Sequence, residues 1–88
     1  MYEINYDSEF FEYMKQLTPD IQIRINKKIE RLREKKQRRH LYYGISFFVE
    51  EVGQYRLGYK VDENIKIITI YFVGKHKDYD TWRKELVR

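Results

Sequence analysis

The spacing of apolar residues changes once along the chain, from a helical period to a strand period. Ile21, Ile25, Ile29 and Leu32 follow one another at steps of three or four residues, which predicts a single apolar stripe along a long helix. After position 44, apolar and polar residues alternate, as they do in half-buried strands. The chain therefore divides into a mainly helical first half and a second half rich in strands.

The first half is expected to form a strand followed by two helices. Apolar and polar residues alternate over positions 2–6, which predicts a short strand. Ser8 is a candidate cap for a helix over 10–17. Thr18 and Pro19 then restart the chain, with Thr18 as the cap of a second helix and Pro19 at its first position.

The second half is expected to form three strands and a final helix. Gly53-Gln54 predicts a tight hairpin turn. In the strand after this turn the odd-numbered positions are apolar, so Arg56 and Lys60 share the opposite face. The predicted segments are strands over 45–52, 55–61 and 65–73 and a helix over 76–87.

This order of elements predicts an α+β fold. A chain of 88 residues is expected to form one domain, spanning positions 1–88. The order is β-α-α-β-β-β-α, with a small antiparallel or mixed sheet of about four strands. We expect the first strand at an edge of this sheet and the helices packed on one of its faces.

Positive charge is concentrated in the second quarter of the chain. The sequence has 18 Lys and Arg against 14 Asp and Glu, and residues 21–40 hold nine bases and only two acids. Such an excess points to a polyanionic partner, either nucleic acid or an acidic peptide. The alternative is a solvated helix face with ion pairs between successive turns. The basic residues singled out here are Lys28, Arg31, Lys35, Arg38 and Arg39.

Several classes of chemistry are excluded by composition. The chain has no cysteine, which removes disulfides, thiolate zinc sites and thiol nucleophiles. Its two histidines stand 36 positions apart, a poor basis for a transition-metal site, and no Gly-rich phosphate loop or Ser-centred elbow is present. No apolar run approaches the roughly 20 residues of a membrane helix. We therefore expect a cytoplasmic protein without a secretory leader, membrane contact, metal or cofactor.

Arg56 interrupts the predicted strand with a cation. On one interpretation it forms a salt bridge to Glu51 or Glu50 across the hairpin. On the other it is a fixed guanidinium that binds phosphate, because its planar fork suits two oxygens. A strand holds such a fork more rigidly than a loop does.

A second candidate group is His76, which stands between Lys75 and Lys77 at the start of the last helix. An imidazole suits general acid–base work near neutral pH, although His76 can equally be a capping group. Tyr79 can donate a proton or stack on a base. Cations, aromatic rings and a histidine suit RNA cleavage without a metal. A 2′-hydroxyl then attacks the adjacent phosphate, cations stabilise the oxyanions and an acid protonates the leaving oxygen.

Two segments of the sequence resemble the RelE/ParE toxin superfamily. They are residues 53–62 (GQYRLGYKVD) and residues 72–79 (FVGKHKDY), and the similarity also covers the helices and the order of strands. The resemblance implies a compact sheet with helices on one side, and a toxin neutralised by a small cognate antitoxin. RelE-like members cut mRNA in the ribosomal A site, whereas ParE-like members poison DNA gyrase.

The resemblance also implies roles for individual residues. Arg56 matches the strand arginine that contacts the scissile phosphate, and His76 matches the basic or histidine position after Gly-Lys. Tyr79 or Trp82 matches the C-terminal aromatic residue that stacks on or protonates the substrate. The residues expected to bind RNA are Lys28, Arg31, Lys35, Arg38, Arg39, Lys60, Lys75, Lys77 and Trp82.

One departure from the family concerns the general base. RelE enzymes carry lysines in the strand before the hairpin, where this chain has FFVEE at 47–51. The base is therefore unassigned, with Glu51 or Glu50 as candidates.

The hypothesis that follows is a ribosome-dependent mRNA endonuclease toxin. Its partners are the ribosome, mRNA and an antitoxin with an acidic inhibitory segment. The alternatives are a non-catalytic module of the same fold that binds RNA or a protein, and a ParE-like gyrase inhibitor.

Overall fold

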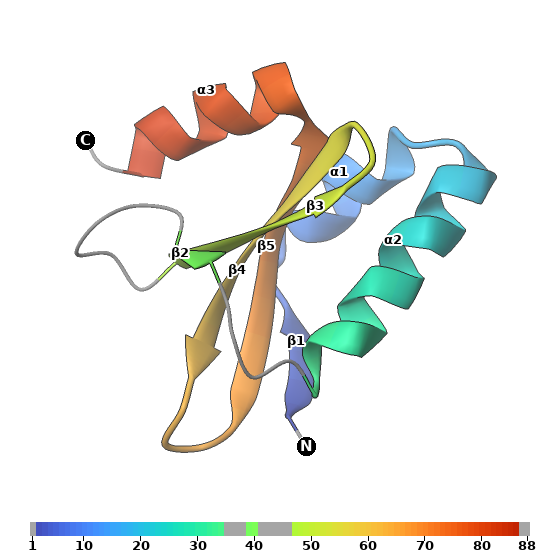
Figure 1. The fold of residues 1–88 in the computed structure, drawn as a ribbon. Coiled ribbons are helices and arrows are strands. Elements are labelled where there is room, and N and C mark those ends of the chain that lie inside the picture. The colour runs from blue at the N-terminus through green and yellow to red at the C-terminus, as the bar shows by residue number, and fades with distance from the viewer. Residues whose placement is uncertain (1, 35–38, 41–46, 87–88) are drawn as a thin grey trace.

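A mixed five-stranded sheet forms the centre of the molecule (Figure 1). The structure, a computed structural model, describes residues 2–34, 39–40 and 47–86. The spatial order of strands is β1-β5-β4-β3-β2, with β1 parallel to β5 and the other pairs antiparallel. The strands are β1 (Glu3–Tyr6), β2 (Arg39–His40), β3 (Phe47–Val52), β4 (Tyr55–Asp62) and β5 (Ile67–Lys75).

The expected order β-α-α-β-β-β-α is confirmed for the four longer strands, and β1 lies at an edge as predicted. The two-residue strand β2 was not predicted, because a strand this short shows no alternation. The helices are α1 (Phe10–Lys15), α2 (Pro19–Leu32) and α3 (His76–Leu86).

The apolar stripe of α2 is buried against one face of the sheet. Ile25, Ile29 and Leu32 have almost no exposed surface and join one core cluster with Leu57 and Tyr59 of β4. The odd-numbered positions of β4 therefore face the helices, as their alternation predicts. Arg56 and Lys60 consequently project from the other face.

The third helix lies on that other face, away from α2 (Figure 1). Its Trp82 ring lies directly over Gly58 of β4, where an added Cβ would stand 2.5 Å from the ring. The same ring stacks on Phe72 of β5, with 5.1 Å between ring centroids. The expectation that the helices pack on one face therefore holds for α1 and α2 but is wrong for α3.

An irregularity in β5 explains the difference. The register between β4 and β5 shifts at Gly58/Tyr59, so that Gly58 pairs with Phe72 whereas Tyr59 pairs with Ile70. Ile70 joins the core under α2, and Phe72 joins a second cluster with Tyr79 of α3. The sequence of this strand is apolar on both faces in its second half, but a regular strand would direct residues 70 and 72 to the same face, so the sequence did not show that Phe72 faces α3.

The ends of the elements are mostly as expected. Thr18 occupies the N-cap position of α2 and Pro19 is its first residue, as predicted, but the Thr18 side chain makes no capping hydrogen bond to the backbone. Ser8 does not cap α1; instead the Asp7 carboxylate accepts a hydrogen bond from the Glu9 amide at 3.2 Å. Strand β5 continues to Lys75, two residues beyond its predicted end. None of the helices in the described part of the chain has the length and apolarity needed to cross a membrane.

Candidate functional site

Arg56 is fixed on the α3 side of the sheet by two neighbours. Its Nη2 lies 3.1 Å from Oε1 of Glu51, the residue directly opposite on β3. Its guanidinium carbon also lies 5.3 Å from the centre of the Tyr79 ring. The Arg56 side chain is 22% exposed, so the ion pair is not buried in the interior. The predicted salt bridge therefore exists, and it holds the guanidinium at the surface of a hollow.

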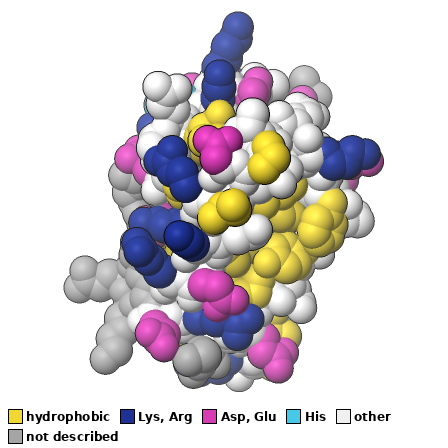
Figure 2. Space-filling model, turned by 90° about the vertical axis from the view of Figure 1, so that its right-hand side faces the viewer, with side chains coloured by type: hydrophobic (Ala, Val, Ile, Leu, Met, Phe, Trp, Pro, Cys, Tyr) yellow, Lys and Arg dark blue, Asp and Glu magenta, His cyan; other side chains and the backbone are white. Residues whose placement is uncertain are grey.

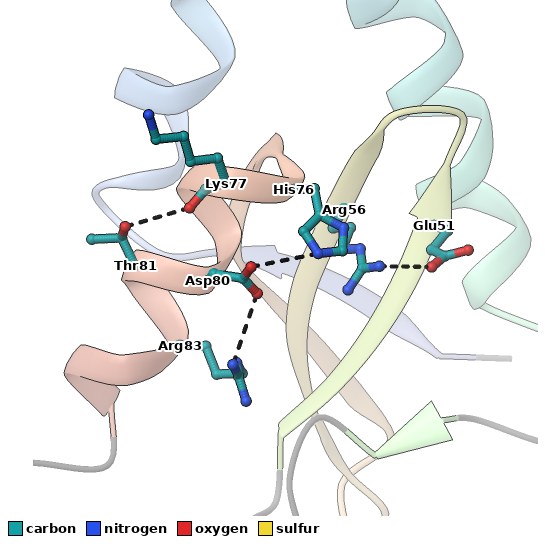
Figure 3. A network of polar contacts seen from close by, with 7 residues as sticks. All are labelled: Glu51, Arg56, His76, Lys77, Asp80, Thr81 and Arg83. Carbon is teal, nitrogen blue, oxygen red and sulfur yellow. Dashed lines mark hydrogen bonds and ion pairs between the residues drawn. The ribbon is translucent and has the colours of Figure 1, made fainter.

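His76 lies in the same hollow as Arg56. It opens α3 immediately after β5. Both side chains line a cavity of about 420 Å³, and Figure 3 shows them next to each other. Its lining residues are Glu51, Gly53, Gln54, Arg56, Lys75, His76 and Lys77.

The hollow has the charge pattern of an anion site. Arg56, Lys75 and Lys77 contribute three cations, whereas Glu51 is the single carboxylate in the lining. Charge-assisted hydrogen bonds from such cations are the strong contacts to phosphate oxygens. In the described part of the chain no three His, Asp or Glu side chains gather closely enough to hold a metal ion.

The two candidate bases are separated by the sheet. Glu51 is paired with Arg56, whereas Glu50 is opposite Leu57, whose side chain lies in the core under α2. Glu50 accordingly contacts Lys28 of α2, at 3.6 Å. Of the two, Glu51 alone is on the side of the hollow.

Tyr79 is buried rather than presented to a substrate. Only 3% of it is exposed, and it packs against Phe72 and Trp82 beneath the Arg56 guanidinium. In this structure the Tyr79 ring supports Arg56 and is not open to a substrate base, so its contact with a substrate stays a prediction. Trp82 is partly buried over Gly58 and anchors α3 to the sheet.

The basic residues of α2 form a second surface on the other side of the molecule. Figure 2 shows Lys and Arg side chains gathered there beside a patch of hydrophobic ones. Arg24, Lys27, Lys28 and Arg31 line a shallow hollow of about 320 Å³ together with the tip of the β3–β4 hairpin. We call these four residues the α2 basic surface. Lys35 and Arg38 lie outside the described residues, as does the side chain of Arg39.

The α2 basic surface adjoins the Arg56 hollow at the hairpin tip. Glu51 and Gly53 line both hollows. An Arg24 nitrogen lies 2.8 Å from the position that a Cβ on Gly53 would occupy. A polyanion can therefore pass from one hollow to the other around the tip.

Two contacts of α3 were missed by the sequence analysis. Asp80 Oδ2 lies 3.4 Å from Nε2 of His76, and Asp80 Oδ1 lies 3.8 Å from Nη2 of Arg83 (Figure 3). The i,i+4 spacing from His76 to Asp80 is the signal that could have found the first contact. Lys60, predicted to bind RNA, lies over the Phe47 ring at 5.3 Å from its centroid.

A larger cavity, of about 730 Å³, lies between α1 and α3. Its lining includes Tyr13, Phe72 and Trp82, and Lys75 is the single base among its lining residues. Burial, followed by Glu9 and Glu85, raises the pKa of the Tyr13 hydroxyl above its ordinary value. This cavity lacks the converging cations of the Arg56 hollow.

The chain was compared with known proteins. No protein-family model matches the sequence, and no curated protein matches it. Several solved structures match the fold. The isolated E. coli RelE toxin is 17% identical with a TM-score of 0.73, and the match covers 98% of this chain and 99% of that one. The toxin–antitoxin complex RelBE2 from Mycobacterium tuberculosis gives 19% identity and a TM-score of 0.76 over 85% of this chain and 91% of that one.

An archaeal structure agrees with these two. The RelE–RelB complex from Pyrococcus horikoshii gives 15% identity and a TM-score of 0.69 over 84% of this chain and 93% of that one. All three matches extend over most of both chains. The chain therefore has the fold of the RelE toxins.

Proposed function

We propose that this protein is the toxin of a toxin–antitoxin pair and that it cleaves mRNA on the ribosome. The observation that carries the proposal is the convergence of Arg56 and His76, from separate segments of the chain, on one open hollow lined by further cations. The RelE-like fold supports the toxin assignment, because the matched structures are RelE toxins and their complexes.

The proposed reaction divides the work among three side chains. Arg56 binds the non-bridging oxygens of the scissile phosphate, and the 2′-hydroxyl attacks the phosphorus. Glu51 accepts the proton of that hydroxyl, and His76 gives a proton to the departing 5′-oxygen. One P–O bond forms as another breaks, so the products are a 2′,3′-cyclic phosphate and a 5′-hydroxyl.

The ion pair between Glu51 and Arg56 fits this sequence of events. In the free protein the carboxylate lies 3.1 Å from the guanidinium. A bound phosphate competes for the same guanidinium fork, which releases Glu51 to act as a base. Substrate binding thereby prepares the base.

The surrounding cations are proposed to hold RNA rather than to react. Lys75 and Lys77 line the hollow itself, and Lys60 projects from the same face of β4. The α2 basic surface lies around the hairpin tip, where it can contact ribosomal RNA. Phosphate contacts of this kind add affinity without sequence preference.

An antitoxin is the proposed protein partner. The M. tuberculosis and P. horikoshii matches are both complexes of a RelE-type toxin with its antitoxin. The hollow around Arg56 and His76 is rich in cations, so an acidic inhibitory segment is expected to cover it.

Purified protein incubated with translating ribosomes tests the proposal. We expect cuts within the message at the ribosomal A site, 2′,3′-cyclic phosphate ends, and no cuts in the absence of ribosomes. Arg56→Ala is expected to lower cleavage by about 100-fold, as the loss of one oxyanion donor commonly does. Circular dichroism of Arg56→Ala verifies that the fold is kept. A message that stays intact at every codon would contradict the proposal.

A further inference from the structure

A second guanidinium lies on the same face of α3 as His76. Arg83 follows His76 by seven residues, so it lies two turns further along the helix and about 10 Å away along its axis. Asp80 stands between them and contacts both (Figure 3). The proposed reaction has no task for Arg83.

The direction of α3 determines where Arg83 lies relative to the sheet. The helix begins next to Gly74, which pairs with Arg56, and its Trp82 lies over Gly58. The helix therefore leads away from the Arg56 end of β4. Its Trp82 ring also contacts Phe47 of β3, which pairs with Lys60, and Arg83 is the next residue after Trp82.

Two pairs of side chains result, one on the helix and one on the strand. His76 and Arg83 form the helical pair. Arg56 and Lys60 form the strand pair, on one face of β4 and about 13 Å apart. Each pair leads from a residue in the Arg56 hollow to a cation outside it. A single nucleic-acid strand carries a phosphate at every nucleotide, so it can meet cations at both ends of such a track.

We propose that Arg83 binds a second phosphate of the same RNA strand, away from the scissile phosphate held by Arg56. This proposal rests on the proposed function, since it assumes that the strand enters the Arg56 hollow. Arg83 is a substrate-binding residue in this scheme and takes no part in the chemical step. Its guanidinium offers the planar fork that suits two phosphate oxygens.

The neighbours of Arg83 are compatible with this role. Its side chain is 31% exposed, so part of it is open to solvent although its Nε is buried. The contact with Asp80, at 3.8 Å, is longer than the 3.1 Å contact between Arg56 and Glu51. Asp80 therefore orients Arg83 through a weaker ion pair, for which a phosphate can compete.

The test measures the binding of a single-stranded RNA oligonucleotide that carries 2′-O-methyl groups and so cannot be cleaved. The dissociation constant is measured across a series of salt concentrations. Arg83→Gln is expected to weaken binding several-fold and to reduce the slope of log K against log salt by about one phosphate contact. Arg83→Lys is expected to keep most of the slope, because it keeps the charge.

Lys15→Gln is the matched control, because it also removes one positive charge. Lys15 lies on α1, in an exposed ion pair with Glu12, and does not line the Arg56 hollow. We expect Lys15→Gln to change the slope little. Equal slopes for Arg83→Gln and Lys15→Gln would overturn the proposal. Arg83→Glu, with its fold verified by circular dichroism, is a second variant and should weaken binding more than Arg83→Gln does.

The design separates this proposal from the proposed function. Binding is measured without ribosomes and without cleavage. If the wild-type protein fails to cut mRNA but Arg83→Gln reduces the salt slope by about one contact, the nuclease assignment fails and the proposed phosphate site stands. If it cuts mRNA while Arg83→Gln behaves like the control, the phosphate site fails alone.

Discussion

The two sides of the sheet differ in how their cations are held. On the α2 side, Arg24, Lys27 and Arg31 project from one helix around a shallow hollow. On the α3 side, Arg56 comes from a strand and is held by a carboxylate and an aromatic ring, with His76 beside it from another element. The hollow on the α2 side is lined by bases of one helix, whereas the hollow on the α3 side combines cations, a carboxylate and a histidine from several elements.

The two arrangements suit different tasks, namely attracting a polyanion and breaking a bond in it. A row of helical cations attracts a polyanion through long-range charge, and salt screens that attraction. Bond breaking needs a cation, a base and an acid held within reach of one phosphate. The α3 side offers the three groups in one hollow, whereas the α2 basic surface contains no histidine. Substitutions on one side of the sheet, with the other side left unchanged as the reference, test this difference.

The largest effect is expected from Glu51→Gln on the α3 side. Loss of the proposed base should lower mRNA cleavage by about 100-fold, within the usual contribution of general base catalysis. Rates are measured on translating ribosomes.

Glu50→Gln is the control for that experiment. It makes the same chemical change one residue away, on the side of α2. Its cleavage rate should stay close to that of the wild type. A Glu51→Gln protein with unchanged rate would show that Glu51 only anchors Arg56.

The second effect concerns the packing of α3 on the sheet. Gly58→Ala would place a methyl group 2.5 Å from the Trp82 ring, which is itself packed against Phe47 and Phe72. We expect the free energy of unfolding to fall by about 1–3 kcal/mol, as overpacking usually costs. Urea unfolding measures the change. In a Trp82→Leu background the same substitution should cost clearly less, and equal costs in both backgrounds would contradict the contact.

A smaller effect is expected on the α2 basic surface. Lys27→Gln combined with Arg31→Gln should weaken RNA binding about tenfold and reduce the salt slope by about two contacts. Cleavage of ribosome-bound message at saturating protein should change little, because neither residue lines the Arg56 hollow. A large fall in the maximal cleavage rate would show that the α2 basic surface also contributes to the chemical step, which contradicts this division.

The smallest effect is electrostatic and local to the start of α2. A hydrogen bond from the Thr18 hydroxyl to Asp20, at 2.6 Å, lowers the pKa of the Asp20 carboxyl. Because the folded pKa is depressed, this contribution to stability exists above the unfolded pKa and is lost as pH falls through the folded pKa. Thr18→Val should raise the pKa of Asp20 toward its ordinary value, which an NMR titration measures. An unchanged titration would show that the hydrogen bond is not the cause.

Local periodicity was enough to determine much of the fold. The stripe on α2, the Gly53-Gln54 turn and the side of β4 that carries Arg56 were all predicted correctly. Each depends on the geometry of one element, in which side-chain direction follows from position. A salt bridge of Arg56 across the hairpin was one of two interpretations, with Glu51 or Glu50 as the partner, and the register of the hairpin selects Glu51.

Other features were decided by packing between distant segments. The irregular pairing of β5 created a second apolar face, which placed α3 across the sheet from α2 and buried Tyr79 beneath Arg56. The sequence offered Tyr79 and Trp82 as equal candidates for contact with a substrate, and only their burial distinguishes them.

The composition and order of residues thus determined which charged groups this protein has and which face of its strand carries Arg56. Tertiary structure alone decided that Arg56, Glu51 and His76 share one hollow, and that Glu50 does not. The reason is physical: a side chain's direction depends on its own backbone, whereas its neighbours depend on how separate elements pack.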